Sequence, residues 1–217
     1  MALAIGNKTF DLNTPSASSR TFSHNQNTGS DGYLYILVAC PSVTVTGVTY
    51  NGVAMTNVGT QTPTVYGTQW TFWKLAAPAT GANNVVVSFS GGQYNPTSTY
   101  VVSTTGSSGS GNVVFDDTAT SPNTNSITVS ANSIVMCGLL AGNTTSHNIT
   151  IDGSSRTLDF THSINNGTSG ALSAVLTSGS KTTSVSNNTD VAGYFMEILE
   201  AAGGSPYGDD GDFFLMF

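Results

Sequence analysis

Apolar and polar residues alternate along most of the chain, and this two-residue period is typical of β-strands that are buried on one face. Clear examples are TQWTFWKLA (68–76) and NVVVSFS (84–90). Two near-continuous apolar runs, YLYILVAC (33–40) and SIVMCGLLAG (133–142), predict more deeply buried strands. No stretch keeps the 3.6-residue apolar period of an amphipathic helix. The pattern therefore predicts an all-β protein.

Two short hairpins stand out from this pattern. VTYNG (48–52) leads alternating residues into Asn-Gly, and ITIDG (149–153) leads them into Asp-Gly. Both dipeptides tolerate the positive φ angles of a type I′ turn, which joins two antiparallel strands. Each pentapeptide therefore predicts a tight β-hairpin.

The order of elements around the two hairpins repeats, which indicates an internal duplication. Each copy has an apolar strand with a cysteine, the hairpin, a return strand, two further strands and a last strand led by tyrosine. The copies span about residues 31–105 and 132–200. In chain order the matching strands are 33–40 and 133–142, 53–60 and 154–161, 68–76 and 170–178, 84–90 and 181–187, and 99–104 and 193–200.

The two copies are expected to form one domain, residues 1–202. No linker divides them, because the low-complexity segment 105–125 contains the apolar NVVF and is short enough to be a crossover loop. Neither copy alone offers enough apolar strands for a closed core. The predicted fold is therefore a single jelly-roll β-sandwich of two sheets, built from two Greek-key-like copies. Two tandem immunoglobulin-like sandwiches are the alternative.

Charge is sparse and negative. Charged residues make up 8% of the chain, and twelve acidic against five basic groups give a net charge of −7. The basic residues are scattered and form no cationic stripe, so nucleic-acid binding is not expected. No apolar run is as long as a transmembrane helix, and the first residues lack the features of a secretory signal. A cytoplasmically made protein with a neutral Ser, Thr and Asn surface is typical of virions assembled inside a bacterium.

A family pattern lies in VTVTGVTYNGVAMTNVGTQ (43–61) followed by WTFWKLAAPATGANNVVVSFSG (70–91). This stretch resembles a jelly-roll type found in virion proteins of bacterial viruses and in some bacterial surface proteins. The resemblance covers about residues 31–105, with the second half as a degenerate copy. It implies a jelly-roll fold, an exterior structural or binding role and assembly around a threefold axis, and it carries no catalytic residues.

The sequence contains no recognisable catalytic motif. A G-x-S-x-G nucleophile elbow is absent, and His24, His147 and His162 stand far apart without the spacing of metal ligands. Each histidine is expected in a turn or on the surface. No catalytic residue, metal ligand or cofactor is therefore assigned.

Five carboxylates are candidates for the pair that a glycosidase needs across its cleft. Asp152 is explained by its turn, Asp116 and Asp117 by an exposed loop, and Glu197 is expected to point to solvent from the last strand. Asp159 completes the set. The chain is predicted not to be an enzyme.

Two cysteines, Cys40 and Cys137, occupy similar places near the ends of the two apolar strands. Two cysteines do not make a disulfide framework. Buried free thiols are expected, and a disulfide that links the copies is the alternative.

Aromatic side chains gather in sequence around one predicted strand. Because side chains alternate along a strand, Trp70 and Phe72 share one face while Trp73 takes the other. One set must belong to the core. The set on the opposite face, which contains either Trp70 or Trp73, is a candidate stacking platform for sugar rings or part of a subunit interface. Tyr66, close by in the sequence, is a further candidate for this platform.

The chain ends in GGSPYGDDGDFFLMF (203–217), hereafter the C-terminal arm. DDGD is interpreted as a solubilising spacer, because it lacks the length and the later Glu of an EF-hand loop. Burying the five apolar side chains would stabilise a contact by roughly 10 kcal/mol before the entropy of ordering is subtracted. The arm either folds back on its own domain or crosses into a neighbouring subunit, and the second is preferred. The predicted assembly residues are Phe213, Phe214, Leu215, Met216 and Phe217.

Together these features predict a non-enzymatic virion structural protein: a capsid decoration, vertex or fibre-base component. Its expected partners are other copies of itself, with a trimer as the first guess, and other virion proteins. One alternative is a carbohydrate-binding module that attaches to host glycans through Trp70 or Trp73. Another is a subunit of an extracellular filament or adhesin.

Overall fold

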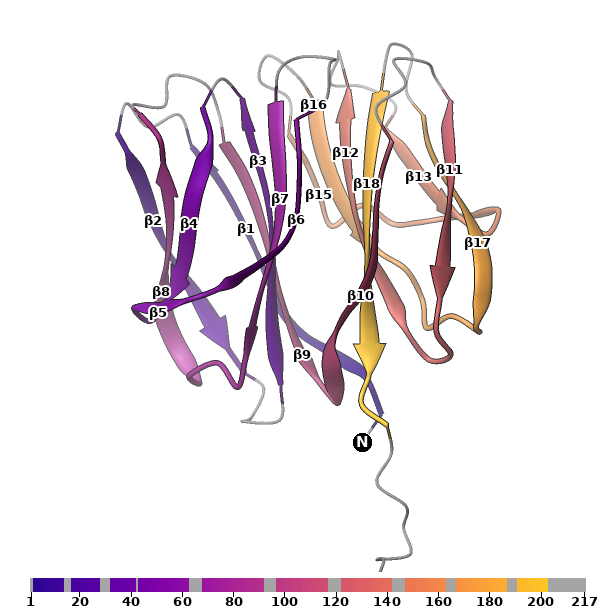
Figure 1. The fold of residues 1–217 in the computed structure, drawn as a ribbon, viewed down its shortest axis with the longest axis horizontal. Coiled ribbons are helices and arrows are strands. Elements are labelled where there is room, and N and C mark those ends of the chain that lie inside the picture. Colours follow the sequence, from indigo (N-terminus) through magenta and orange to yellow (C-terminus); the bar gives the residue numbers. More distant parts are fainter. Residues whose placement is uncertain are drawn as a thin grey trace, which may run out of the picture.

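The computed structural model describes residues 2–13, 17–27, 32–41, 43–62, 68–91, 97–116, 122–141, 147–162, 167–186 and 191–202. In these ranges the chain forms eighteen β-strands and no helix (Figure 1), which confirms the all-β prediction. The part of the chain described here accordingly contains no helix long and apolar enough to cross a membrane.

Nine strands belong to an N-terminal half, up to residue 105, and nine to a C-terminal half, from residue 107. The first nine are β1 (Ala4–Asn13), β2 (Ser19–Gln26), β3 (Tyr33–Pro41), β4 (Val45–Tyr50), β5 (Val53–Ala54), β6 (Thr56–Gln61), β7 (Thr68–Ala76), β8 (Gly81–Phe89) and β9 (Thr97–Thr105). The second nine are β10 (Ser107–Asp116), β11 (Asn123–Val129), β12 (Ile134–Ala141), β13 (Asn148–Ile151), β14 (Ser154–Ser155), β15 (Phe160–His162), β16 (Gly167–Leu172), β17 (Gly179–Ser186) and β18 (Val191–Glu200).

Each half has a five-stranded inner sheet and a four-stranded outer sheet. The inner sheets run β1-β9-β3-β7-β6 and β10-β18-β12-β16-β15, and the outer sheets run β2-β8-β4-β5 and β11-β17-β13-β14. Adding nine to every strand number of the first half gives the order of the second half. The duplication is therefore longer than the sequence predicted, because it also includes β1 and β2 in one copy and β10 and β11 in the other.

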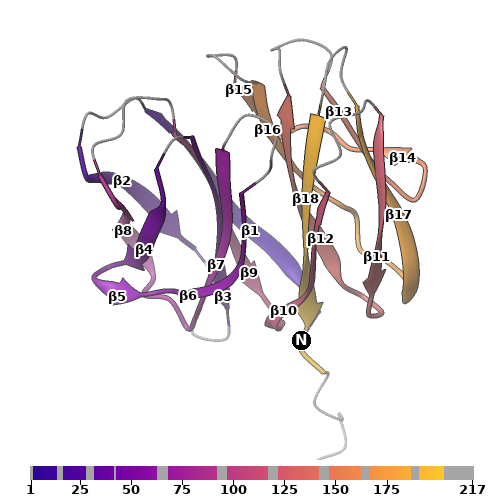
Figure 2. The ribbon, with the colours of Figure 1, turned by 45° about the horizontal axis from the view of Figure 1, so that its top comes forward.

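The four sheets form layers in the order outer, inner, inner, outer (Figures 1 and 2). One apolar core fills each half between its outer and inner sheets, and a third lies between the two inner sheets. The sequence pattern predicts a single sandwich of two sheets from the whole chain; the structure has four sheets. The reason is that each copy contributes nine strands, including short ones, and these suffice for two sheets of its own.

Both predicted hairpins are present. Asn51 and Gly52 have φ angles of 49° and 76°, and Asp152 and Gly153 have φ angles of 53° and 74°. Two successive positive φ angles are the signature of a type I′ turn. Tyr50 pairs with Val53 across the first turn, which joins β4 to β5.

The contact between the inner sheets has an approximate two-fold arrangement. In its middle, β3 meets β12, where a Cβ on Gly138 would stand 2.7 Å from Leu37 Cδ2. On one side, Trp70 of β7 stacks on Tyr194 of β18; on the other, Ser98 of β9 shares a hydrogen bond with Thr168 of β16. Because β7 corresponds to β16 and β18 to β9, the halves meet like two subunits of an isologous dimer.

This contact has two edges, which we name by their outermost strands. At the β6–β10 seam, β6 and β7 contact β10 and β18; at the β1–β15 seam, β1 and β9 contact β15 and β16. Register places Phe10 and Phe115 at equivalent positions, since they pair with the equivalent tyrosines Tyr100 and Tyr194.

Candidate functional site

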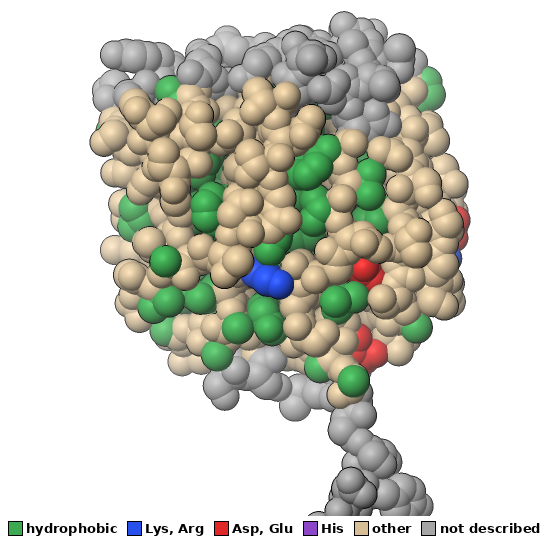
Figure 3. Space-filling model, viewed as in Figure 1, with side chains coloured by type: hydrophobic (Ala, Val, Ile, Leu, Met, Phe, Trp, Pro, Cys, Tyr) green, Lys and Arg blue, Asp and Glu red, His purple; other side chains and the backbone are tan. Residues whose placement is uncertain are grey.

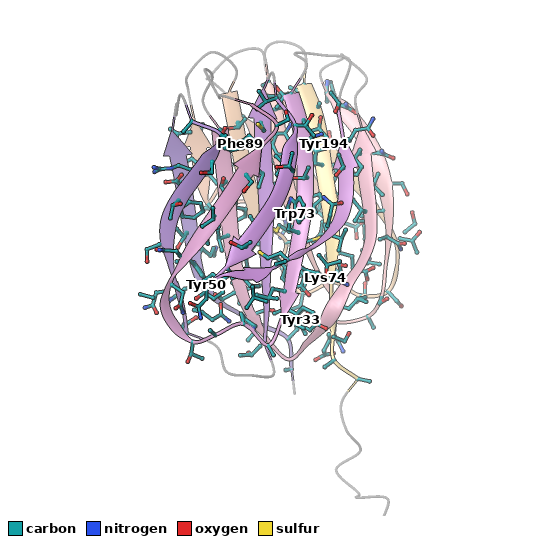
Figure 4. All side chains as sticks on the ribbon, turned by 60° about the vertical axis from the view of Figure 1, so that its left-hand side comes forward. Tyr33, Tyr50, Trp73, Lys74, Phe89 and Tyr194 are labelled. Carbon is teal, nitrogen blue, oxygen red and sulfur yellow. The ribbon has the colours of Figure 1, made fainter. Side chains whose placement is uncertain are left out.

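Both tryptophans of the proposed sugar platform are buried. Trp70 is 1% exposed and stacks on Tyr194 between the inner sheets, with ring centroids 4.3 Å apart. Trp73 lies in the core of the N-terminal half (Figure 4), where its Nε1 donates a hydrogen bond to Thr71 Oγ1 at 2.7 Å. A stacking platform needs an exposed ring face, so neither indole can serve as one in this structure. Tyr66 lies outside the described residues.

The predicted assembly residues Phe213–Phe217 also lie outside the described residues, but the point where the chain enters the arm is defined. The Ala201 amide donates to the Gly106 carbonyl at 2.7 Å, so the chain leaves β18 beside the start of β10. The Leu3 amide donates to Glu200 Oε1 at 3.3 Å. The first described residues and the end of the last strand therefore share one end of the body (Figure 1).

A serine–histidine pair lies in the N-terminal half. His24 was expected in a turn or on the surface, but it is fully buried in β2. Its Nδ1 lies 2.8 Å from Thr9 Oγ1 and its Nε2 lies 2.7 Å from Ser103 Oγ. Ser103 also donates to Gln26 Oε1 at 2.5 Å. The His24 ring can be buried because polar partners from β1 and β9 satisfy both of its nitrogens.

Proton positions in this network do not suit nucleophilic catalysis. With Gln26 Oε1 as the acceptor of the Ser103 hydroxyl proton, His24 donates from Nε2 and accepts from Thr9 at Nδ1. A nucleophilic serine would instead direct its proton toward the histidine. Burial lowers the pKa of His24 to about 4, which keeps the ring neutral near pH 7. The network fastens β1 and β9 of the inner sheet to β2 of the outer sheet.

Glu197 was expected to point to solvent, but it is 1% exposed. Its carboxylate accepts hydrogen bonds from the backbone amides of Asn112, at 3.2 Å, and Ser130, at 2.5 Å. A Cβ on Gly111 would collide with the carboxylate, so glycine is required for this close approach. The backbone amides replace the water that Glu197 loses on burial, and the residue ties β10 and the end of β11 to β18.

The other predicted polar residues have structural surroundings where they are described. Asp152 lies in its turn, as predicted, and also pairs with Lys181 at 3.3 Å. His147 Nδ1 lies 2.5 Å from Ser169 Oγ. Asp117 and the side chains of Asp116 and His162 are outside the described part. In that part, no three His, Cys, Asp or Glu side chains are grouped so that they could hold a metal ion.

Both cysteines are buried free thiols, as predicted. Cys40 lies in the core of the N-terminal half and Cys137 in that of the C-terminal half. They belong to different cores, and the alternative of a disulfide between the copies is wrong. Burial raises the pKa of the Cys137 thiol, which keeps it protonated and unreactive.

A groove opens at the β1–β15 seam, with a volume of about 520 Å³. The N-terminal half contributes side chains from β1, and the C-terminal half contributes the segment between β14 and β15 and the end of β16. The side chains that give the groove its character are Ile5, Lys8, Arg156, Thr157, Asp159 and Leu172.

The groove carries an excess of positive charge. Lys8 Nζ pairs with Asp159 Oδ1 at 2.5 Å, and the Tyr100 hydroxyl donates to the other oxygen of the same carboxylate. Burial, with the nearby Asp159, raises the pKa of Tyr100, so its hydroxyl stays a donor. Arg156 Nε donates to the Ser154 carbonyl at 3.1 Å. No carboxylate among the described residues lies within ion-pair distance of Arg156. Two cations with one carboxylate suit an anionic ligand group.

The groove could not be found from sequence patterns because its members are distant in the chain. Lys8 precedes the first predicted copy, and Arg156 is one of five basic residues that are scattered along the sequence. They meet because β1 of one half lies against the β14–β15 segment of the other. No local sequence motif indicates that these two residues lie close together in the fold. Comparison of the chain with protein-family models, with curated proteins and with solved structures gave no match.

Proposed function

We propose that this chain is a non-enzymatic structural protein of a bacterial virus particle, a capsid decoration, vertex or fibre-base component, and that its copies assemble through the C-terminal arm. The observation that carries the proposal is a contrast in apolar surface. Among the described residues, only Val53 and Val175 are large hydrophobic side chains with high exposure. The arm, in contrast, carries five consecutive large apolar side chains.

This contrast favours a partner for the arm. The three apolar cores of the body are filled by its own strands, and the two exposed valines are single residues, not a patch. Left in water, an apolar, uncharged and proline-free pentapeptide is prone to aggregation. A neighbouring subunit that covers it removes this hazard and supplies a fastening between copies.

The surface of the body fits an exterior role. Figure 3 shows a face with few charged side chains, on which uncharged polar side chains and backbone predominate and apolar side chains are scattered, both where the two halves meet and over the N-terminal half. Four β-layers held by three cores make a stiff body. These features, with the resemblance in residues 31–105, support a virion location.

The jelly-roll topology is part of the proposal, with one jelly roll in each half. Its support is the nested pairing of strands: β1 with β9, β2 with β8, β3 with β7 and β4 with β5. A long hairpin that is folded over itself into two sheets gives such nesting. The C-terminal half repeats the order. A trimer is the first oligomeric state to test, because it is what the resemblance implies.

The carbohydrate-binding alternative depends on exposed indole rings. Trp70 and Trp73 are 1% and 7% exposed. No described feature therefore favours glycan binding over assembly.

The experiment that tests the proposal compares the full chain with a chain that ends at Ala202. Because the eighteen strands of the described residues all precede residue 202, the shorter chain is expected to keep its thermal unfolding temperature within a few degrees and to lose its oligomer in mass photometry. An unchanged oligomer after truncation would contradict the proposal. So would a full chain that is monomeric at all concentrations.

A further inference from the structure

We propose that the groove at the β1–β15 seam is the acceptor for a short stretch of the C-terminal arm of a neighbouring copy, around Asp212 and Phe213, where the acidic and apolar parts of the arm meet. This inference rests on the proposed function and names the surface that the function requires.

The charges of the groove and of the arm are complementary. The groove presents Lys8 and Arg156 but only one carboxylate, Asp159, and that carboxylate is already bound by Lys8 and Tyr100. The arm contains three aspartates, at 209, 210 and 212, and no basic residue. An aspartate of the arm can pair with the Arg156 guanidinium in the two-pronged geometry that arginine offers to carboxylates.

The order of side chains in the arm matches the walls of the groove. Ile5 and Leu172 line the groove and pack against the middle core, so they give it an apolar wall beside the cations. In the arm, Asp212 is followed at once by Phe213. A volume of about 520 Å³ lies within the range of pockets that hold a drug-sized ligand. It therefore fits a short peptide stretch, not the whole arm.

The related position at the β6–β10 seam shows that packing does not require these charges. Lys8 pairs with Val102, and its counterpart Val113 pairs with Met196 on the equivalent strand. Val113 closes its seam by apolar contact, since a Cβ on Gly59 would lie 3.0 Å from Val113 Cγ1. The same fold thus packs apolar side chains at the β6–β10 seam and has an open, cationic groove at the β1–β15 seam.

The arm begins with a spacer that can bridge a gap between two copies. Residues 203–208 separate Ala202 from the first aspartate, and six extended residues span at most about 20 Å. The spacer contains three glycines and one proline, which suits an extended linker better than a helix or a central strand.

A charge exchange tests the inference on full-length protein. One variant carries Arg156→Glu, and a second carries Asp209→Lys, Asp210→Lys and Asp212→Lys. Each alone is expected to raise the apparent dissociation constant of the oligomer roughly tenfold or more, because like charges then face each other. An equimolar mixture of the two variants is expected to recover complexes in mass photometry, since the lysine-bearing arm of one variant then meets the acidic groove of the other.

Lys74→Glu is the matched control. Lys74, labelled in Figure 4, is a partly exposed lysine near the β6–β10 seam that donates to Ser110 Oγ at 3.1 Å and pairs with no described carboxylate. This substitution reverses the same charge outside the groove and is expected to leave the oligomer unchanged. Thermal unfolding of every variant verifies that the body stays folded.

The outcomes separate the inference from the proposed function. If truncation at Ala202 abolishes the oligomer but Arg156→Glu does not weaken it, the arm docks elsewhere and the inference fails alone. If the mixture of the two variants does not recover the oligomer but a single chain with both sets of substitutions does, the arm occupies the groove of its own chain. Docking in a neighbouring copy is then overturned. If truncation leaves the oligomer intact, the proposed function itself fails.

Discussion

The two seams between the halves occupy equivalent places in a duplicated fold, yet they are built from different side chains. At the β6–β10 seam, Phe72 of β7 pairs with Gly59 of β6. At the β1–β15 seam, the sizes are exchanged: Gly170 of β16 pairs with Phe160 of β15. Phe160 stacks on Phe10 with ring centroids 4.0 Å apart, whereas Phe72 is tilted against Phe115 at 6.1 Å.

The exchange shows that this pair of positions keeps its combined size, one phenylalanine and one glycine, whichever of the two strands carries the phenylalanine. A large side chain on either strand of an edge pair fills the space between the inner sheets, provided that its partner is glycine. Because a phenylalanine fills the space at each seam, the side chains at neighbouring positions can differ between the two seams. One seam is closed by Val113 and Phe115, and the other holds Lys8, Arg156 and Asp159 around a groove.

The largest expected effect comes from Trp70→Ala on the β6–β10 side. Removing a fully buried indole that stacks on Tyr194 should lower the free energy of unfolding by about 3–5 kcal/mol. The control is Thr168→Ala at the corresponding position of β16, where only a hydrogen bond to Ser98 is lost, with an expected cost of about 1 kcal/mol. Urea denaturation measures both, and equal losses would contradict the difference between the seams.

Acid should lower the free energy of unfolding through His24, which is hydrogen-bonded to Thr9 on the strand that carries Lys8. The pKa of His24 is about 4 in the folded protein and about 6.5 in the unfolded chain, so the unfolded chain binds more protons between these values. Stability is then fully present above pH 6.5 and falls as the pH drops toward 4, by at most about 3 kcal/mol. Urea midpoints across this range test the sign, and His24→Asn should remove most of the slope. A slope that survives this substitution would exclude His24 as its source.

Gly170 and Gly59, the small partners of Phe160 and Phe72, should differ in how well they tolerate substitution by alanine. A Cβ on Gly170 would collide with the Phe160 ring, so Gly170→Ala should cost about 1–3 kcal/mol in free energy of unfolding. A Cβ on Gly59 meets Val113 and Phe115 at 3.0 and 3.2 Å, so Gly59→Ala should stay within about 1 kcal/mol of the original protein. Adding Phe160→Leu should recover part of the loss in Gly170→Ala, and a purely additive double mutant would refute the contact.

The smallest expected effect concerns the ion pair in the groove. The Lys8 side chain is 39% exposed and that of Asp159 is 20% exposed, so Lys8→Gln should cost less than about 1 kcal/mol. The difference should shrink further in about 0.5 M salt, because salt screens exposed charges. A loss above about 2 kcal/mol by urea denaturation would mean that the groove charges serve the fold and not a partner.

Local signals in the sequence were sufficient for part of the fold. Asn51-Gly52 and Asp152-Gly153 specify their hairpins through backbone φ angles alone, and the apolar runs at 33–40 and 133–142 became the buried central strands β3 and β12. The sequence pattern does not single out β1 and β10 as matching strands, because their likeness is one short stretch, GNKTFD (6–11) and GNVVFD (111–116), that lies outside both predicted copies. Without these two strands, each predicted copy has too few strands for two sheets.

The polar interior was out of reach of sequence patterns for a different reason. His24 is buried because Thr9 and Ser103 satisfy its nitrogens, and Ser103 lies 79 residues away in the chain. Glu197 is buried because backbone amides of a distant segment satisfy its carboxylate. The packing of strands that are distant in the sequence supplies these partners. It also places Lys8 and Arg156 in the lining of the same groove. Isolated polar residues in a strand pattern look like surface positions until such partners are known.

The most direct measurement places a photo-crosslinking phenylalanine analogue at position 214 and mixes copies of natural isotope content with ¹⁵N-labelled copies. After irradiation, mass spectrometry of tryptic peptides identifies what the arm touches. Crosslinks that join an arm of one isotope content to groove residues near Ile5, Arg156 or Leu172 of the other are the predicted result. Crosslinks confined to single isotope contents, or to peptides outside the β1–β15 seam, would contradict assembly through this groove.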